Sequence, residues 1–202
     1  MSDDKYIYAE TVGSAADTLF FTFHGTGGTE AQFHELATEL VPGAHVISPR
    51  GDVSERGASR FFRRTGEGVY DMEDLAARTR QMGDFIATQR DRIGAKRVVG
   101  MGYSNGANIL ASVLLDRPDL VDETILLHPL IPWAPVDQPG LEARNVLIAA
   151  GKRDPICPPD ATLRFQSFLQ GQDANVRVEW HKGGHEIQRN ELVAASRFLN
   201  AG

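Results

Sequence analysis

The sequence predicts an α/β fold in which a mostly parallel sheet of about seven strands is flanked by helices. Two patterns support this prediction. Short apolar runs alternate with longer amphipathic stretches, and runs such as LFFTF and VLIAA are apolar at successive positions. Strands of that kind are buried on both faces, as in a parallel sheet covered by helices. Because no linker or internal repeat divides the chain, we expect a single domain over 1–202 with no separate cap domain.

The expected strands follow the apolar runs. They are 6–11, 18–24, 45–49, 97–102, 123–128, 145–151 and 176–181. Only a short connection separates the first of these runs from the second, whereas a parallel crossover needs a longer one. The first strand is therefore expected at an edge of the sheet, antiparallel to its neighbour.

Two of the expected helices show a clear apolar stripe. The first covers about 71–92, and its stripe consists of Met72, Leu75, Thr79, Met82 and Ile86. Asp71 stands where a helix cap is expected. The second covers about 187–200, and its stripe consists of Leu192, Ala195, Ser196 and Leu199. Helices placed between strands in this way predict right-handed crossovers and a parallel sheet.

Composition excludes several classes of function. A formal net charge of -6 argues against nucleic acid as the main partner, because phosphate binding needs a basic face. The single cysteine, Cys157, excludes an internal disulfide framework and is typical of a reducing compartment. No apolar run has the length of a membrane span, and the first residues do not resemble a signal peptide. We therefore expect a cytoplasmic protein.

Ser104 is the first candidate for a catalytic residue. It lies in GYSNG, residues 102–106, between the strand expected at 97–102 and the helix-like run NGANILASVLLD. The alternative is a tight turn without chemistry. A strand before, a helix after and glycines at both offsets favour a nucleophile elbow, which lifts the serine hydroxyl above the carboxyl edge of the sheet.

Two further residues complete a possible catalytic triad. A serine hydroxyl needs a base to take its proton and a group that orients the base. Asp154 follows the strand at 145–151, and His185 follows the strand at 176–181 and two glycines. The order Ser, Asp, His agrees with that expected for an elbow serine. Asp154 could instead cap a helix, and His181, four residues before His185, is the rival base.

The loop FHGTGG, residues 23–28, is expected to help bind an oxyanion. Its glycines let backbone amides point inward, and the Thr26 amide, with Gly27 as its neighbour, is the preferred donor. The second donor is the Asn105 amide at the start of the helix after Ser104. A phosphate-binding loop is the alternative, but the lysine of a P-loop is missing.

The motifs HGTGG, GYSNG, GKRDPI and GGHE together resemble the α/β-hydrolase superfamily. More narrowly, they are similar to its small phospholipase/carboxylesterase branch, which includes the acyl-protein thioesterases. The stretch SPRGDVSERGASRFFRRTGEGVYDMEDL and the segment LLHPLIP look closest to bacterial carboxylesterases linked to hydroquinone resistance. The resemblance implies an ester or thioester hydrolase without a cofactor. It also implies a triad of Ser104, Asp154 and His185, with Thr26 and Asn105 as the oxyanion amides.

Metal and thiol chemistry are not expected. His34 and Glu35 lack the second histidine of a zinc-protease helix, and glycines break the helix that would align His181 with His185. Dienelactone hydrolases share the fold and resemble a version with a cysteine nucleophile. Here the elbow carries serine, so Cys157 is expected as a pocket wall or buried filler.

Substrate contacts are expected from segments above the sheet edge. Residues 50–70, rich in arginine, are either a solvated loop with local ion pairs or a flap over the site. In the flap, Phe61 or Phe62 would face the substrate and an arginine would meet an anionic group. Trp133 and Ile156 are expected to line the acyl pocket. His128 ends a strand nearby and has either a supporting or a structural role.

The sequence thus favours a serine carboxylesterase that cleaves small carboxylic esters through an acyl-enzyme intermediate. A lysophospholipase or acyl-protein thioesterase is the alternative, although no long apolar lid is evident. A hydrolase-fold binding protein without catalysis is the alternative from another class. The expected partner is a small-molecule ester, and the sequence makes no prediction about oligomeric state.

Overall fold

A computed structural model describes residues 6–200 of the chain. Its centre is a seven-stranded sheet in the order β1-β3-β2-β8-β9-β10-β11. The strands of this sheet are β1 (Tyr8–Thr11), β2 (Ala15–Phe23), β3 (Ala44–Pro49), β8 (Arg97–Tyr103), β9 (Glu123–Leu127), β10 (Asn145–Gly151) and β11 (Asn175–His181). Adjacent strands are parallel except β1 and β3. The predicted α/β fold with a mostly parallel sheet is confirmed.

Each of the seven predicted strands is present, and the edge position of β1 is also confirmed. β1 is antiparallel, but it pairs with β3 and not with β2, which follows it along the chain. β3 lies between the two, parallel to β2 and antiparallel to β1. The short connection after β1 therefore crosses the end of β3 and does not form a hairpin.

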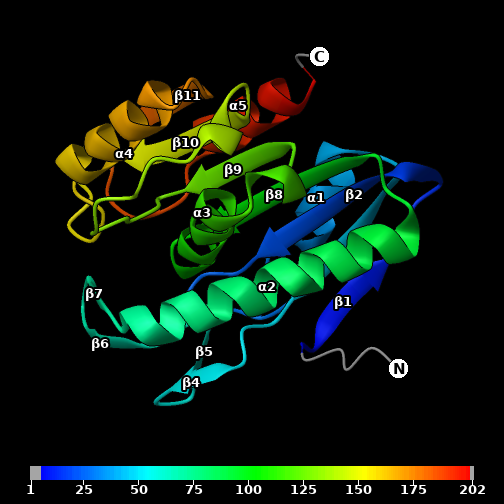
Figure 1. Ribbon diagram of the computed structural model, residues 1–202, viewed down its shortest axis with the longest axis horizontal. Helices are drawn as coiled ribbons and strands as arrows, with labels where there is room; N and C mark the ends of the chain where they lie inside the picture. Colours follow the sequence, from blue (N-terminus) through cyan, green and yellow to red (C-terminus); the bar gives the residue numbers. More distant parts are fainter. Residues whose placement is uncertain (1–5, 201–202) are drawn as a thin grey trace.

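Helices cover both faces of the sheet (Figure 1). The helices are α1 (His34–Leu40), α2 (Met72–Ile93), α3 (Asn105–Asp116), α4 (Pro159–Gly171) and α5 (Arg189–Leu199), with short 3-10 turns at Pro118–Leu120 and Pro139–Leu141. Side chains alternate along β2: Leu19 and Phe21 pack in the core layer of α2, α3 and α4, whereas Phe20 packs in the layer of α1 and α5. Burial on both faces explains the uninterrupted apolar runs.

The two predicted helix stripes are largely confirmed. In α2, Asp71 accepts a hydrogen bond from the Asp74 amide, as a cap does, and the later stripe residues are buried. Met72 is the exception, because the first residue of α2 lies beyond the core and keeps 47 % of its surface exposed. In α5, Ala195 and Leu199 are buried with Phe198, whereas Leu192 and Ser196 are half-buried.

Residues 50–70 match neither of the two expected arrangements in full. They contain two small hairpins, β4 (Val53–Glu55) with β5 (Ala58–Arg60) and β6 (Arg64–Gly66) with β7 (Val69–Tyr70). Figure 1 shows both hairpins near the start of α2. Local ion pairs are present, since the Glu55 carboxylate contacts both Arg60 and Arg64. The segment is thus an ordered addition to the domain, and its phenylalanines pack into the core of the domain.

Phe61 and Phe62 belong to that core, and the prediction that one of them faces the substrate is wrong. Both side chains are completely buried. The Phe61 ring lies 5.7 Å from that of Phe23, and the Phe62 ring lies 4.9 Å from that of Tyr70. Two adjacent apolar rings are stabilised more by packing between the hairpins and the sheet than by facing a wet cleft.

The parallel strands end at one edge of the sheet, and the loops that follow them contain the candidate site residues. β2 is followed by Thr26, β8 by Ser104, β10 by Asp154 and β11 by His185. Because parallel strands all end on the same side, residues far apart in the sequence meet above this edge. The fold thus brings the candidate site residues together although they are far apart in the sequence.

Candidate active site

Ser104 sits at a sharp turn between β8 and α3. Its φ of 51° and ψ of -116° are unusual for a residue with a side chain, and its amide is held by the Leu127 carbonyl at 2.9 Å. The turn needs small neighbours. A Cβ added at Gly106 would lie 2.2 Å from the Phe23 carbonyl oxygen, and one at Gly102 would lie 2.5 Å from the Gly106 carbonyl oxygen. The glycines at both offsets are therefore required by close packing.

Ser104, His185 and Asp154 form a continuous chain of hydrogen bonds. The Ser104 hydroxyl lies 2.9 Å from His185 Nε2, and His185 Nδ1 lies 2.7 Å from Asp154 Oδ2. His181, the rival base, lies at the end of β11 with its Nε2 atom 3.5 Å from that of His128. The structure places His185, and not His181, against the serine.

Asp154 is buried, yet its surroundings favour the ionised form. Its Oδ1 atom accepts hydrogen bonds from the amides of Ile156 at 2.8 Å and Cys157 at 2.9 Å. Burial raises the pKa of Asp154, but the hydrogen bonds from Cys157, His185 and His128 outweigh it and lower that pKa below its ordinary value. An ionised Asp154 can hold the imidazole of His185 in the tautomer that accepts a proton at Nε2.

Thr26 and Asn105, whose amides are the expected oxyanion donors, lie beside Ser104. Asn105 is the first residue of α3, and Thr26 lies in the glycine-rich loop after β2; both residues line the same pocket as Ser104. The Gly27 amide donates to the Ser59 carbonyl at 2.9 Å, whereas the Thr26 amide has no acceptor among residues 6–200. The Thr26 hydroxyl accepts a hydrogen bond of 2.6 Å from Arg60, which fixes the loop. Thr26 and Asn105 are thus suited to bind an oxyanion.

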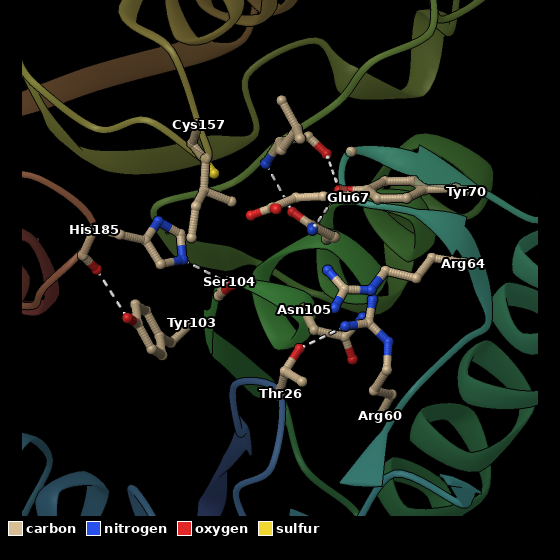
Figure 2. Close-up of a pocket in the computed structure, with 14 residues that line it drawn as sticks. Thr26, Arg60, Arg64, Glu67, Tyr70, Tyr103, Ser104, Asn105, Cys157 and His185 are labelled. Carbon is tan, nitrogen blue, oxygen red and sulfur yellow. Dashed lines mark hydrogen bonds between the residues drawn. The ribbon is translucent and has the colours of Figure 1, made fainter. Parts of the chain in front are cut away.

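The pocket at Ser104 is small and has one polar wall. Its volume is about 270 Å³. Figure 2 shows Ser104 and His185 on one side of it and Arg60 and Arg64 on the other. The remaining lining residues include Glu67, Tyr70, Asn108, Leu130, Ile156 and Cys157. Such a space suits a short substrate with polar groups better than a long alkyl chain.

Of the predicted substrate contacts, only Ile156 lines this pocket. Trp133 does not, because it packs edge-on against Tyr70, with 6.2 Å between ring centroids, and lines a separate groove with Met72. The sequence did not identify Tyr103, whose hydroxyl donates to the His185 carbonyl at 2.8 Å and so holds the loop that contains His185. The position of Tyr103 directly before Ser104 was the only feature of the sequence that could have indicated a role in the site. Arg60 and Arg64 line the pocket; the sequence predicted only that an arginine of residues 50–70 could meet an anionic group there, without indicating which one.

Comparison with known proteins identifies the family. Residues 55–190 match the model of the dienelactone hydrolase family. The chain is also 38 % identical over 196 residues to MhqD of Bacillus subtilis (strain 168), a protein named as a hydrolase, and covers 96 % of both chains. The chain belongs to the dienelactone hydrolase family.

Two solved structures of similar proteins have the same fold over nearly their whole length. The protein Atu2452 of Agrobacterium tumefaciens, described as of unknown function, is 50 % identical with a TM-score of 0.93, over 100 % of this chain and 98 % of that one. A carboxylesterase of Bacillus cereus is 33 % identical with a TM-score of 0.91, over 100 % of this chain and 97 % of that one. The predicted membership of the carboxylesterase branch of the α/β-hydrolase superfamily is confirmed. No helix within the described residues has the length and apolarity needed to cross a membrane.

In this member of the family the cysteine is not placed as a nucleophile. Cys157 is buried, and its Sγ atom donates to the His128 carbonyl at 3.1 Å. Burial raises the pKa of the Cys157 thiol, with a further contribution from Asp154. Since the thiolate is the reactive form, Cys157 is kept unreactive. Cys157 therefore only lines the wall of the pocket.

A second group of polar side chains lies behind Asp154. His128 Nε2 lies 3.1 Å from Glu191 Oε1 and 3.5 Å from His181 Nε2, distances that would also suit ligands of one metal ion. However, the Gly183 amide donates to His181 Nδ1 at 3.0 Å. A neutral histidine that binds a metal through Nε2 carries its proton on Nδ1, where it would oppose that amide. The donor set therefore does not fit a metal.

Proposed function

We propose that this protein is a serine carboxylesterase that cleaves small carboxylic esters through an acyl-enzyme intermediate. The observation that carries the proposal is the hydrogen-bonded chain from Ser104 Oγ through His185 to Asp154, beside a pocket that contains two candidate oxyanion donors. Similarity to the Bacillus cereus carboxylesterase supports the class of reaction. The three residues are those that the sequence motifs suggested.

In the proposed reaction, His185 takes the proton of Ser104 as the hydroxyl oxygen attacks the ester carbonyl. The amides of Thr26 and Asn105 stabilise the oxyanion of the tetrahedral intermediate. This intermediate collapses when His185 gives the proton to the leaving alcohol, and the acyl group stays on Ser104. A water molecule, deprotonated by His185, then attacks the acyl-enzyme and releases the acid with Ser104 restored.

The pocket supports a short acyl group. Its volume of about 270 Å³ is below the size typical of sites for drug-sized ligands, and the polar wall of Arg60 and Arg64 would be left poorly hydrated beside a long alkyl chain. This favours a carboxylesterase over the alternative of a lysophospholipase or acyl-protein thioesterase. The intact hydrogen-bonded chain favours an enzyme over a binding protein.

Kinetics on p-nitrophenyl esters of increasing acyl length test the proposal. We expect kcat/KM to be highest for acetate or butyrate and at least tenfold lower for laurate, because a twelve-carbon chain exceeds the pocket. Ser104→Ala should remove turnover of every ester, whereas Ser54→Ala, at an exposed position on β4, should retain it. Preference for laurate would favour the lysophospholipase alternative, and absence of turnover would favour a binding protein.

A further inference from the structure

His128 is a buried histidine that the proposed acyl transfer does not use. It follows β9 with a φ of 53°, a conformation that is rare for a residue with a side chain, and its side chain is completely buried. His128 Nδ1 lies 2.9 Å from Asp154 Oδ2, the same oxygen that accepts from His185. On the other side of the ring, Nε2 lies 3.1 Å from Glu191 Oε1. The imidazole thus bridges two buried carboxylates.

The hydrogen bonds around the ring determine where its protons lie. Asp154 Oδ2 is an acceptor, so His128 Nδ1 carries a proton. Glu191 Oε2 accepts from the Gln188 amide at 2.6 Å, whereas Oε1 has no hydrogen-bond partner among the described residues and lies within ion-pair distance of His128 Nε2. Since a carboxylate oxygen cannot donate, His128 Nε2 must carry the second proton for this contact to be favourable.

His181 does not take the place of His128 as the histidine that pairs with Glu191. Its Nδ1 atom accepts from the Gly183 amide, which assigns its own proton to Nε2, and Nε2 lies 3.7 Å from Glu191 Oε1. That distance is too long for a normal hydrogen bond. The short contact of Glu191 is the one with His128. A charged imidazolium donates to Asp154 and forms an ion pair with Glu191, while the 3.5 Å contact of its Nε2 atom with His181 Nε2 is the longest of the three.

We propose that His128 is a positioning residue: a buried imidazolium, paired with Glu191, that holds Asp154 in place and places a positive charge behind it. The inference rests on the proposed function, because His185 is taken to be the general base. It extends the hydrogen-bonded chain of Ser104, His185 and Asp154 to His128, and adds an ion pair between His128 and Glu191. His128 itself does not touch the pocket.

The charges that face His128 come from several elements. Asp154, in the loop after β10, and Glu191, on α5, are the acidic groups; His181 and His185 are the other imidazoles, with the His185 ring 5.1 Å away. Tyr103 and the Cys157 thiol also lie close, and burial raises the pKa of both, which keeps them uncharged. Burial lowers the pKa of His128, but hydrogen bonds to Glu191 and Asp154 outweigh it and raise that pKa above its ordinary value.

The expected effect on pH dependence has a definite sign. A buried positive charge makes the uptake of a further proton by the surrounding site less favourable. Loss of the His128 charge should therefore raise the apparent pKa on the acid side of the kcat/KM profile. For a charge about 5 Å away in a partly buried site, a shift of at least about one pH unit upward is expected.

The variants His128→Asn and His128→Leu separate positioning from charge. The asparagine amide can reproduce the hydrogen bond from Nδ1 to Asp154 but carries no charge, whereas leucine provides neither. The double variant with His128→Asn and Glu191→Gln also removes the carboxylate that would otherwise be buried without its partner. We expect the upward shift in all three, with kcat near pH 8 retained within about tenfold in the asparagine variants and reduced further with leucine.

A purely structural role for His128 would give a different result. Thermal stability would fall in the variants while the acid side of the profile stayed at the parental pH, and this outcome would overturn the inference. The double variant keeps the test decisive if His128→Asn alone does not fold.

NMR of the parental protein, labelled with nitrogen-15 in histidine, tests the charge without any substrate. At pH 8 both ring nitrogens of His128 should be protonated, with signals that disappear in the double variant. One protonated and one unprotonated ring nitrogen would contradict the inference even if esters are cleaved. Failure of the parental protein to cleave esters would instead contradict the proposed function, while the NMR result still decides whether His128 is charged.

Discussion

At the scale of single residues, the site depends on backbone geometry as much as on side chains. Ser104 reaches its position because Gly102 and Gly106 allow contacts that a Cβ would prevent. Arg60 fixes Thr26, and Tyr103 fixes the loop of His185, although neither residue takes part in the proposed proton transfer. These neighbours keep the distances around Ser104 near those that a reaction requires.

Cys157 provides a prediction at this scale. Cys157→Ser should retain most of the ester turnover, with kcat/KM within about threefold of the parental value, because a hydroxyl can replace the thiol as donor to the His128 carbonyl. Cys157→Ala is the matched control, since it removes the donor but keeps the side chain small. Loss of turnover in both variants, with the fold retained, would show that the thiol takes part in the chemistry.

At the scale of elements, the two hairpins of residues 50–70 show where sequence patterns mislead. Adjacent phenylalanines among arginines and glycines look the same in a flap and in a small packed unit. The difference lies in long-range contacts: the Phe61 amide donates to Asn105 Oδ1 at 2.7 Å, and its ring lies 4.6 Å from that of His24. Hairpins β4–β5 and β6–β7 therefore contribute Arg60 and Arg64 to the pocket, and their aromatic rings to the core.

Phe61→Ala should accordingly destabilise the protein. Truncation of a fully buried phenylalanine removes its packing and leaves a cavity, so the free energy of unfolding should fall by about 3–5 kcal/mol. Urea denaturation of the variant measures this change. Val136→Ala is the control, because Val136 is 83 % exposed and should change the free energy by less than about 0.5 kcal/mol. Unchanged stability of Phe61→Ala, with an altered acyl preference, would instead return Phe61 to the pocket.

At the scale of the whole molecule, the sequence was sufficient for the sheet and for the residues above its edge. Apolar runs such as LFFTF are typical of strands that are buried on both faces of a parallel sheet. The residues of the proposed triad lie in loops that follow such strands, so they meet at one edge of the sheet in the order Ser, Asp, His. The pocket walls could not be predicted in that way. Whether Trp133 or Phe62 faces the pocket depends on how segments distant in the sequence pack together. The contact between His128 and Glu191 likewise joins residues that are 63 positions apart. Local patterns contain no information about such pairs.

The measurement that tests the central claim most directly is labelling of the protein by a fluorophosphonate, followed by mapping of the modified peptide. Such probes react with a serine whose hydroxyl is activated by a neighbouring base. We predict one adduct per chain, on Ser104, with no labelling of Ser104→Ala and normal labelling of the exposed control Ser54→Ala. An adduct on another residue, or a folded protein that cleaves esters but is labelled equally well without Ser104, would contradict the account.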